Sequence, residues 1–212
     1  MAAPRHFTIG PSAMRTLLLQ RTEYQRAEFA GRIPEAFYAD MRREFDELAP
    51  HLPDHAQTIL DIGGGLGAID IFLLDRYRLD RPHVHLFDKN EIADDVRYFF
   101  GNAPSAYNLF DATQDFLTAN GVAADAFTQI DAGAGPFPTA LRPDLVVSLI
   151  AWGYHFPVGV YLPSVLDCLS DDGCLVIDVR KETGGINEIM SAFSDVILVR
   201  ETFRQIRLVA YR

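Results

Sequence analysis

The chain has 212 residues, and apolar residues make up 49% of them, which is ordinary for one globular α/β domain with a core. Its 19 basic and 29 acidic residues give a net charge of −10, which disfavours nucleic acid and anionic membranes as partners and favours a small-molecule substrate. Residues 1–10 lack the apolar segment of a signal peptide, and no run is long enough to span a membrane, so we expect a cytoplasmic protein. Cys168 and Cys174 have no metal-ligand spacing, so we expect two buried free thiols and no metal site.

Residues 1–55 are expected to form a helical lid or cap. Residues 11–29 have a helical pattern, and Pro34 can begin a second helix because proline is tolerated in a first turn. Pro50 and Pro53 then end that helix. Its apolar side chains recur at helical spacing: Phe37, Met41, Phe45 and Leu48.

These two helices have a simple structural interpretation and a functional one. They could pack against the domain without touching a ligand. Alternatively, they could cover a pocket, because pockets in open α/β sheets lie beyond the carboxyl ends of the strands. In the second interpretation Tyr24 and Phe29 would face the ligand.

A glycine cluster after the first predicted strand organises the rest of the chain. The apolar run that begins at Thr58 contains Asp61 and leads into Gly63, Gly65 and Gly67, after which an apolar segment continues to residue 74. This pattern predicts a strand, a tight turn and a helix whose free N–H groups point over the turn.

Two ligands fit this turn. The spacing Gly63-x-Gly65-x-x-Ala68, with Asp88 about 20 residues further on, suits a dinucleotide. The same segment, written from Asp61, also resembles motif I of the class I S-adenosylmethionine (SAM) methyltransferases. In that motif the acidic residue can reach the cationic amino acid end of SAM.

The next predicted strand, residues 84–89, ends in Asp88, a carboxylate that could accept both ribose hydroxyls or could be an ordinary turn aspartate. Residues 91–108 form an aromatic-rich insertion that includes Tyr98 and Tyr107. It could line a substrate site or form a small satellite core.

The remaining elements alternate between helix and strand. We expect helices at residues 109–121 and 160–169, strands at 126–132, 144–152 and 174–179, and a short helix ending near residue 193. The run in residues 145–150 is almost continuously apolar, as in a strand buried on both faces. The strands at 195–200 and 205–211 are separated by so few residues that they should form an antiparallel hairpin.

This order resembles the class I methyltransferase fold over residues 34–212. The resemblance implies an α/β, Rossmann-like, seven-stranded sheet that is mostly parallel, with the last strand antiparallel and helices on both faces, and residues 56–212 would be the SAM-binding domain. Within this superfamily, residues 148–155 are similar to a group of sugar O-methyltransferases. The resemblance implies that Asp61, Gly63, Gly65 and Gly67 hold the methionine part of SAM. It implies that Asp88, with Lys89 adjacent, binds the ribose and that Asp131 and Ala132 frame the adenine. Ser148 and Ile150 would line the pocket from the fourth strand.

The charges of the two cofactors favour SAM over a dinucleotide. SAM carries a cationic amine and a sulfonium, which suit carboxylates and carbonyl groups, whereas Asp61 would repel a pyrophosphate. Methyl transfer to an alcohol is helped by a general base, and His155 is the best candidate, with a hydrogen-bonded loop histidine as the alternative. Tyr154 would then orient the acceptor, and Trp152 would form an aromatic wall.

We therefore expect a SAM-dependent methyltransferase that acts on a hydroxyl of a small molecule. One alternative is a SAM cyclase, in which the α-amine attacks its own γ-carbon to give azetidine-2-carboxylate and methylthioadenosine. It would enclose the sulfonium in an aromatic box built from Tyr24, Phe29, Tyr98, Tyr107, Trp152 and Tyr154. The other alternative is a SAM-binding protein without catalysis.

Overall fold

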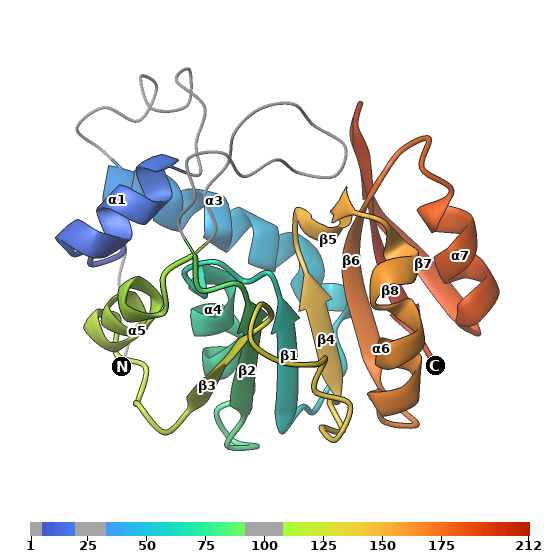
Figure 1. The fold of residues 1–212 in the computed structure, drawn as a ribbon, viewed down its shortest axis with the longest axis horizontal. Helices are drawn as coiled ribbons and strands as arrows, with labels where there is room; N and C mark the ends of the chain where they lie inside the picture. The colour runs from blue at the N-terminus through green and yellow to red at the C-terminus, as the bar shows by residue number, and fades with distance from the viewer. Residues whose placement is uncertain (1–5, 20–32, 92–107) are drawn as a thin grey trace.

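A sheet of seven strands forms the centre of the molecule. Figure 1 shows that the sheet is twisted and lies between helices. The computed structural model describes residues 6–19, 33–91 and 108–212. The strands are, in sheet order, β3 (Phe127–Asp131), β2 (His83–Asp88), β1 (Thr58–Ile62), β4 (Leu145–Ser148), β6 (Cys174–Arg180), β8 (Gln205–Tyr211) and β7 (Asp195–Glu201). The helices are α1 (Pro11–Leu19), α3 (Ile33–Leu48), α4 (Ala68–Arg76), α5 (Phe110–Ala119), α6 (Leu162–Cys168) and α7 (Gly185–Ala192), with short 3-10 helices η1 (Ala49–His51) and η2 (Val158–Val160).

The strand directions confirm the predicted fold class. The strands β3, β2, β1, β4 and β6 pair in parallel, which places their carboxyl ends at the same edge of the sheet. The last strand, β8, lies between β6 and β7 and is antiparallel to both. The three residues between β7 and β8 form the tight link expected of a hairpin, in which the N–H of Thr202 donates to the carbonyl oxygen of Gln205 at 2.8 Å.

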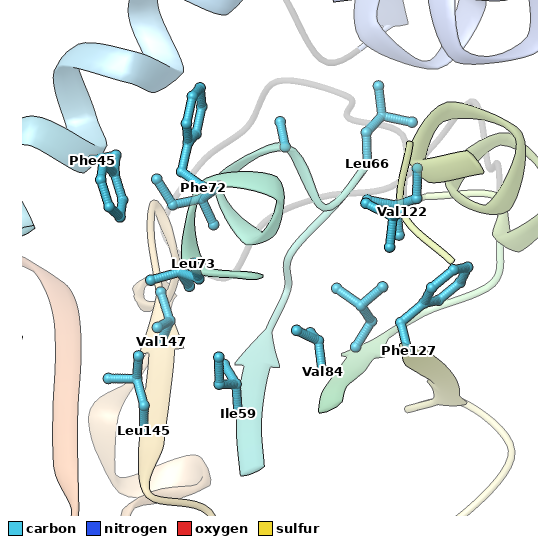
Figure 2. Packing of buried hydrophobic residues seen from close by; sticks show 14 of the residues in the cluster. Phe45, Ile59, Leu66, Phe72, Leu73, Val84, Val122, Phe127, Leu145 and Val147 are labelled. Atoms are coloured by element: carbon cyan, nitrogen blue, oxygen red, sulfur yellow. The ribbon is translucent and has the colours of Figure 1, made fainter. Parts of the chain in front are cut away.

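Alternating side chains of the strands build one core on each face of the sheet. On β1, Ile59 faces the core shared with α1, α3, α4 and α5, whereas Leu60 and Ile62 face the core shared with α6 and α7. Figure 2 shows the first core, where Phe72 and Leu73 of α4 pack over the sheet. Truncating a buried aromatic side chain such as Phe72 to alanine typically costs about 3–5 kcal/mol, so these cores fix the positions of the strand ends.

The helix α3 has the apolar face that its sequence predicts. Phe37, Phe45 and Leu48 are buried, and Met41 packs at the edge of the same core. The α-helix stops at Leu48, where η1 begins with a proline in its first turn, as expected. Of the predicted first helix, α1 is described and the rest lies outside the described residues.

The prediction of one strand over residues 144–152 is wrong. The strand β4 ends at Ser148, and a separate strand, β5 (Ala151–Phe156), follows it and lies beside β6. The break is at Ile150, whose φ of 53° is left-handed and cannot continue a strand. The Ser148 hydroxyl stabilises the break, since it donates to the Ile62 carbonyl at 2.8 Å and accepts the Trp152 N–H at 3.0 Å. The strand β5 therefore occupies residues that were expected to form a loop.

Cys168 and Cys174 are both buried and free, as the sequence predicts. Within the described parts of the chain, no helix is long and apolar enough to cross a membrane. The same residues contain no group of three or more acidic, histidine or cysteine side chains placed to hold a metal ion.

Candidate active site

The turn that links β1 to α4, residues 63–67, is called the glycine turn here. Gly63 has a φ of 75°, and a methyl group placed on it would lie 2.4 Å from the Cβ atom of Ala151. Gly64 needs its small size for another reason, since a methyl group there would lie 2.3 Å from Asp61 Oδ2. Only glycine fits these two positions, and the turn therefore lies directly against Asp61 on one side and β5 on the other.

Gly65 is held by side chains from two other elements. Its N–H donates to Asp88 Oδ2 at 3.0 Å, and its carbonyl oxygen accepts hydrogen bonds from the Thr113 hydroxyl, at 2.9 Å, and from the Asn108 side chain. Asn108 and Thr113 are buried and were not singled out by the sequence. Asn108 is the final residue of the segment expected to be an aromatic insertion, so its polar side chain gave little signal there. Together these contacts fix the turn at the tip of β2.

A cavity of about 750 Å³ lies beyond the carboxyl ends of the central strands, a size typical of small-molecule sites. Figure 1 shows α3 crossing above these strand ends, and α3 contributes side chains to the cavity lining. The sequence-predicted residues that line it are Asp61, Gly63, Gly65, Asp88, Lys89, Ala132, Ile150, Trp152, Tyr154 and His155. It is also lined by residues that the sequence analysis did not single out for the site, which include Gly64, Asn108, Glu44, Gln205 and Arg207.

Asp61 places a buried carboxyl at the floor of this cavity. Its side chain lies on the α4 face of the sheet, the residue is 2% exposed, and Oδ2 has no hydrogen-bond partner among the described residues. Burial raises the pKa of the Asp61 carboxyl well above its ordinary value, and the nearby carboxyls of Asp70 and Asp88 raise it further. A positive charge bound here would reverse these effects, so the site favours a cationic ligand group.

Asp88 and Asp131 lie side by side, because they are register partners at the ends of β2 and β3. Burial raises the pKa of Asp88 to about 6, while the N–H groups of Gly65 and Lys89 act in the opposite direction. Oδ1 of Asp131 accepts the Gly133 N–H at 2.8 Å, and the Ala132 N–H donates to the Asp88 carbonyl at 2.9 Å. This edge thus presents carboxylate oxygens and a small residue next to the glycine turn.

Tyr154 and His155 lie on β5 and also line the cavity. Their rings meet edge to face with centroids 4.8 Å apart, and the Arg180 guanidinium lies 5.4 Å from the centre of the Tyr154 ring. Burial, together with the positive charge of Arg180, lowers the pKa of His155 to about 4. His155 is therefore uncharged at neutral pH. Trp152 is 1% exposed, and its indole N–H donates to the Val158 carbonyl at 2.9 Å.

An ion-pair network around the buried Arg207 closes the cavity at the side of β8. Arg207 is 0% exposed and pairs with Asp178, its partner on β6, through bonds of 2.8 and 2.7 Å. Glu44 of α3 pairs with Arg207 and also with Arg200 of β7, the latter at 2.8 and 3.0 Å. Glu47, one turn further along α3, accepts from Arg200 at 3.0 Å. These contacts join α3 to the strands β7 and β8.

Some predicted residues lie at the site without lining the cavity. Gly67 is the left-handed N-cap of α4, with a φ of 72°, Asp131 accepts the Gly133 N–H, and Ser148 stabilises the break between β4 and β5. Ile150, in that break, is half exposed and faces the cavity. Four residues expected near the substrate lie outside the described residues: Tyr24, Phe29, Tyr98 and Tyr107.

Solved structures of methyltransferases share this architecture. Precorrin-6y C5,15-methyltransferase from Geobacter metallireducens GS-15 aligns over 97% of this chain and 95% of its own, with 13% identity and a TM-score of 0.54. An O-methyltransferase family protein from Burkholderia thailandensis aligns over 94% of this chain and 67% of its own, with 14% identity and a TM-score of 0.54. The ribosomal protein L11 methylase from Lactobacillus delbrueckii subsp. bulgaricus aligns over 77% of this chain and 72% of its own, with 15% identity and a TM-score of 0.50.

No family profile and no curated protein sequence matches the chain. The fold is that of the class I SAM-dependent methyltransferases, as the sequence analysis predicted. The three structural neighbours differ in the acceptor that their names indicate.

Proposed function

We propose that the protein is a SAM-dependent methyltransferase that methylates a hydroxyl group of a small molecule. The proposal rests on the buried carboxyl of Asp61, which lies next to the glycine turn. Its Oδ2 atom has no hydrogen-bond partner among the described residues. A cationic α-ammonium group would supply the missing charge and hydrogen bond, whereas a pyrophosphate in this place would be repelled. The buried carboxyl thus favours SAM over a dinucleotide, although the glycine spacing alone allows both.

Other residues of the site suit the rest of the cofactor. Asp88 offers carboxylate oxygens for the ribose hydroxyls, with Lys89 adjacent, and Asp131 and Ala132 would frame the adenine. Gly63 and Gly65 allow the backbone to approach the methionine part closely, and Gly67 begins the helix behind them. SAM would supply the electrophilic methyl group, while the chain would bind and align the two reactants.

The acceptor would lie between the cofactor and β5. Tyr154 and His155 present an aromatic and a neutral polar surface there, which suits an uncharged hydroxyl compound better than an anion. The unprotonated ring of His155 could accept a hydrogen bond from the hydroxyl and then its proton, although a pKa of about 4 makes it a weak base. Trp152, held by its indole N–H, would support this wall from behind.

The proposal is tested by incubating the protein with SAM, first alone and then with a mixture of small hydroxylated metabolites, and measuring the products by mass spectrometry. S-adenosylhomocysteine that forms only with the mixture supports methyl transfer, and the methylated product identifies the acceptor. Methylthioadenosine formed from SAM alone would instead indicate the cyclase, and bound SAM without product would indicate a binding protein. With the acceptor known, His155→Gln should lower kcat by about 10²–10⁴-fold if His155 is the base.

A further inference from the structure

Asp70 has a buried carboxyl that takes no part in the proposed binding of cofactor or acceptor. It lies in the first turn of α4 and is 1% exposed, and neither of its oxygens has a hydrogen-bond partner among the described residues. A carboxylate near a helix N-terminus is stabilised by the helix dipole, but such residues are ordinarily in contact with water. Asp111 shows this ordinary case, since it lies in the first turn of α5 and is exposed.

Asp70 faces Asp61 beneath the glycine turn, and each carboxyl influences the pKa of the other. Two glycines locate the pair, because a methyl group placed on Gly64 would lie 2.3 Å from Asp61 Oδ2 and one placed on Gly67 would lie 3.4 Å from Asp70 Oδ2. Two ionised carboxylates have no donor to offer each other, so their close approach is favourable when one of them carries a proton.

We propose that Asp61 and Asp70 share a proton in the unliganded protein and release it to solvent when the α-ammonium group of SAM binds at the glycine turn. This inference rests on the proposed function. The ammonium group keeps its own protons, and the charge of the pair changes from −1 to −2 as the cation arrives. No bond other than the O–H bond of the pair is broken. Asp70 is thus a positioning residue that acts through Asp61, which alone of the two lines the cavity.

The groups around the pair favour this exchange. Asp88 on β2 adds a negative charge that promotes retention of the proton in the empty site. On the other neighbouring strand, β4, the residue in register with Asp61 is the apolar Val147, and α5 presents Leu117 to Gly67. Burial raises the pKa of Asp70 to about 7, within the range in which such a proton can be exchanged at physiological pH.

The charged side chains of the other cavity elements have partners of their own. From α3, Arg43 pairs with Asp40 at 2.9 Å and Glu44 pairs with the arginines of β7 and β8. On β8, Arg207 is held by Asp178. Lys89, at the end of β2, lines the cavity beside Asp88 and also has an interaction partner. The binding of an ammonium group is therefore what changes the charge around the Asp61–Asp70 pair.

Isothermal titration calorimetry of the full chain at pH 7.0, in two buffers with different ionisation enthalpies, tests the proposal. The first probe is S-adenosylhomocysteine, which carries the α-ammonium group. The second is methylthioadenosine, which lacks the amino acid end but keeps the ribose that Asp88 would bind. Because a group with a pKa of about 7 is about half protonated at pH 7.0, we expect S-adenosylhomocysteine to release roughly half a proton more than methylthioadenosine. Its affinity should rise by up to tenfold per pH unit as the pH rises from 6 to 7.

Two variants complete the experiment. Asp70→Asn should still bind S-adenosylhomocysteine but lose most of the proton release, because the amide donates to Asp61 and leaves it ionised before binding. Asp111→Asn, in the corresponding turn of α5, should behave as the wild type. Equal proton release with both probes in the wild-type protein, or undiminished release in Asp70→Asn, would overturn the inference while leaving the proposed function intact. Failure of both SAM and S-adenosylhomocysteine to bind would overturn the proposed function, and this inference with it.

Discussion

Replacing Arg207 with methionine should destabilise the protein strongly, because it leaves a carboxylate buried without a partner. Arg207 and Asp178 are both 0% exposed and are joined by two hydrogen bonds. Removing one member of a buried pair typically costs about 3–5 kcal/mol, a large part of the roughly 5–15 kcal/mol that stabilises a domain. With a urea dependence of about 2 kcal/mol per M, the unfolding midpoint should fall by ~2 M.

The measurement is urea unfolding followed by circular dichroism at pH 8, where a buried carboxyl is least able to take up a proton. Arg200→Met is the matched control, since Arg200 is in register with Arg207 and shares Glu44, but its side chain is 22% exposed. Its ion pairs should contribute only about 0–1 kcal/mol, as expected for pairs in contact with water.

A double variant separates the lost ion pair from lost packing. Replacing Asp178 with leucine in the Arg207→Met background removes the unpaired charge, and Glu44 keeps both of its hydrogen bonds to Arg200. We expect the double variant to recover about 2–3 kcal/mol relative to Arg207→Met. A cost below ~1 kcal/mol for Arg207→Met, or a double variant no more stable than the single one, would refute this reasoning.

Three further predictions concern the candidate site. The folded-state pKa of Asp70 is about 7 and the unfolded value is about 3.9, so between these values the folded protein holds a proton that the unfolded chain has released. The free energy of unfolding should therefore decrease as the pH rises from about 5 to 7.5, and Asp70→Asn should flatten that decrease; a rise over this range in urea titrations would contradict it. Asp88→Ala should weaken SAM binding by about 1–3 kcal/mol in calorimetry, and an unchanged Kd would remove Asp88 from the site. Gly64→Ala should reduce SAM affinity at least ~10-fold, because its methyl group displaces Asp61, whereas Gly135→Ala, where a methyl group meets nothing within 4 Å, should bind normally; equal affinities would show that the close approach is unimportant.

The overall fold was predictable because its signals are local. The alternation of apolar runs with helical segments predicts the parallel strands, and the short link after β7 requires an antiparallel partner for it. The glycine turn was equally clear, since Gly63 and Gly65 have left-handed backbones that other residues seldom adopt. The tips of β1 and β2 follow from these elements, so Asp61 and Asp88 were expected at one edge of the sheet.

The break between β4 and β5 left no trace in the sequence. Isoleucine favours strands and rarely adopts a positive φ, so Ile150 extended the apolar run instead of ending it. Its conformation is set by tertiary contacts, namely the hydrogen bonds of Ser148 to β1 and to Trp152. The contact with Ile62 links residues that are 86 positions apart, and periodicity does not report it or the local contact with Trp152.

Two buried polar groups of the site were missed for different reasons. Asp70 carried a usable signal, because it lies among the apolar residues at the start of α4, and burying a carboxyl there is costly unless it has a partner or a function. The pairing of Glu44 with Arg207 carried none, since the two residues are 163 positions apart and both types are common on surfaces.

That long-range pairing has a consequence for biosynthesis. The helix α3 emerges early from the ribosome, but the arginines that hold Glu44 belong to the two final strands, and β8 must insert between β6 and β7 to present Arg207. Contacts of such high sequence separation form slowly. The helix α3 is therefore fixed beside the cavity only after β8 has been synthesised, and a nascent chain would expose the unfinished pocket to chaperones until β8 is in place.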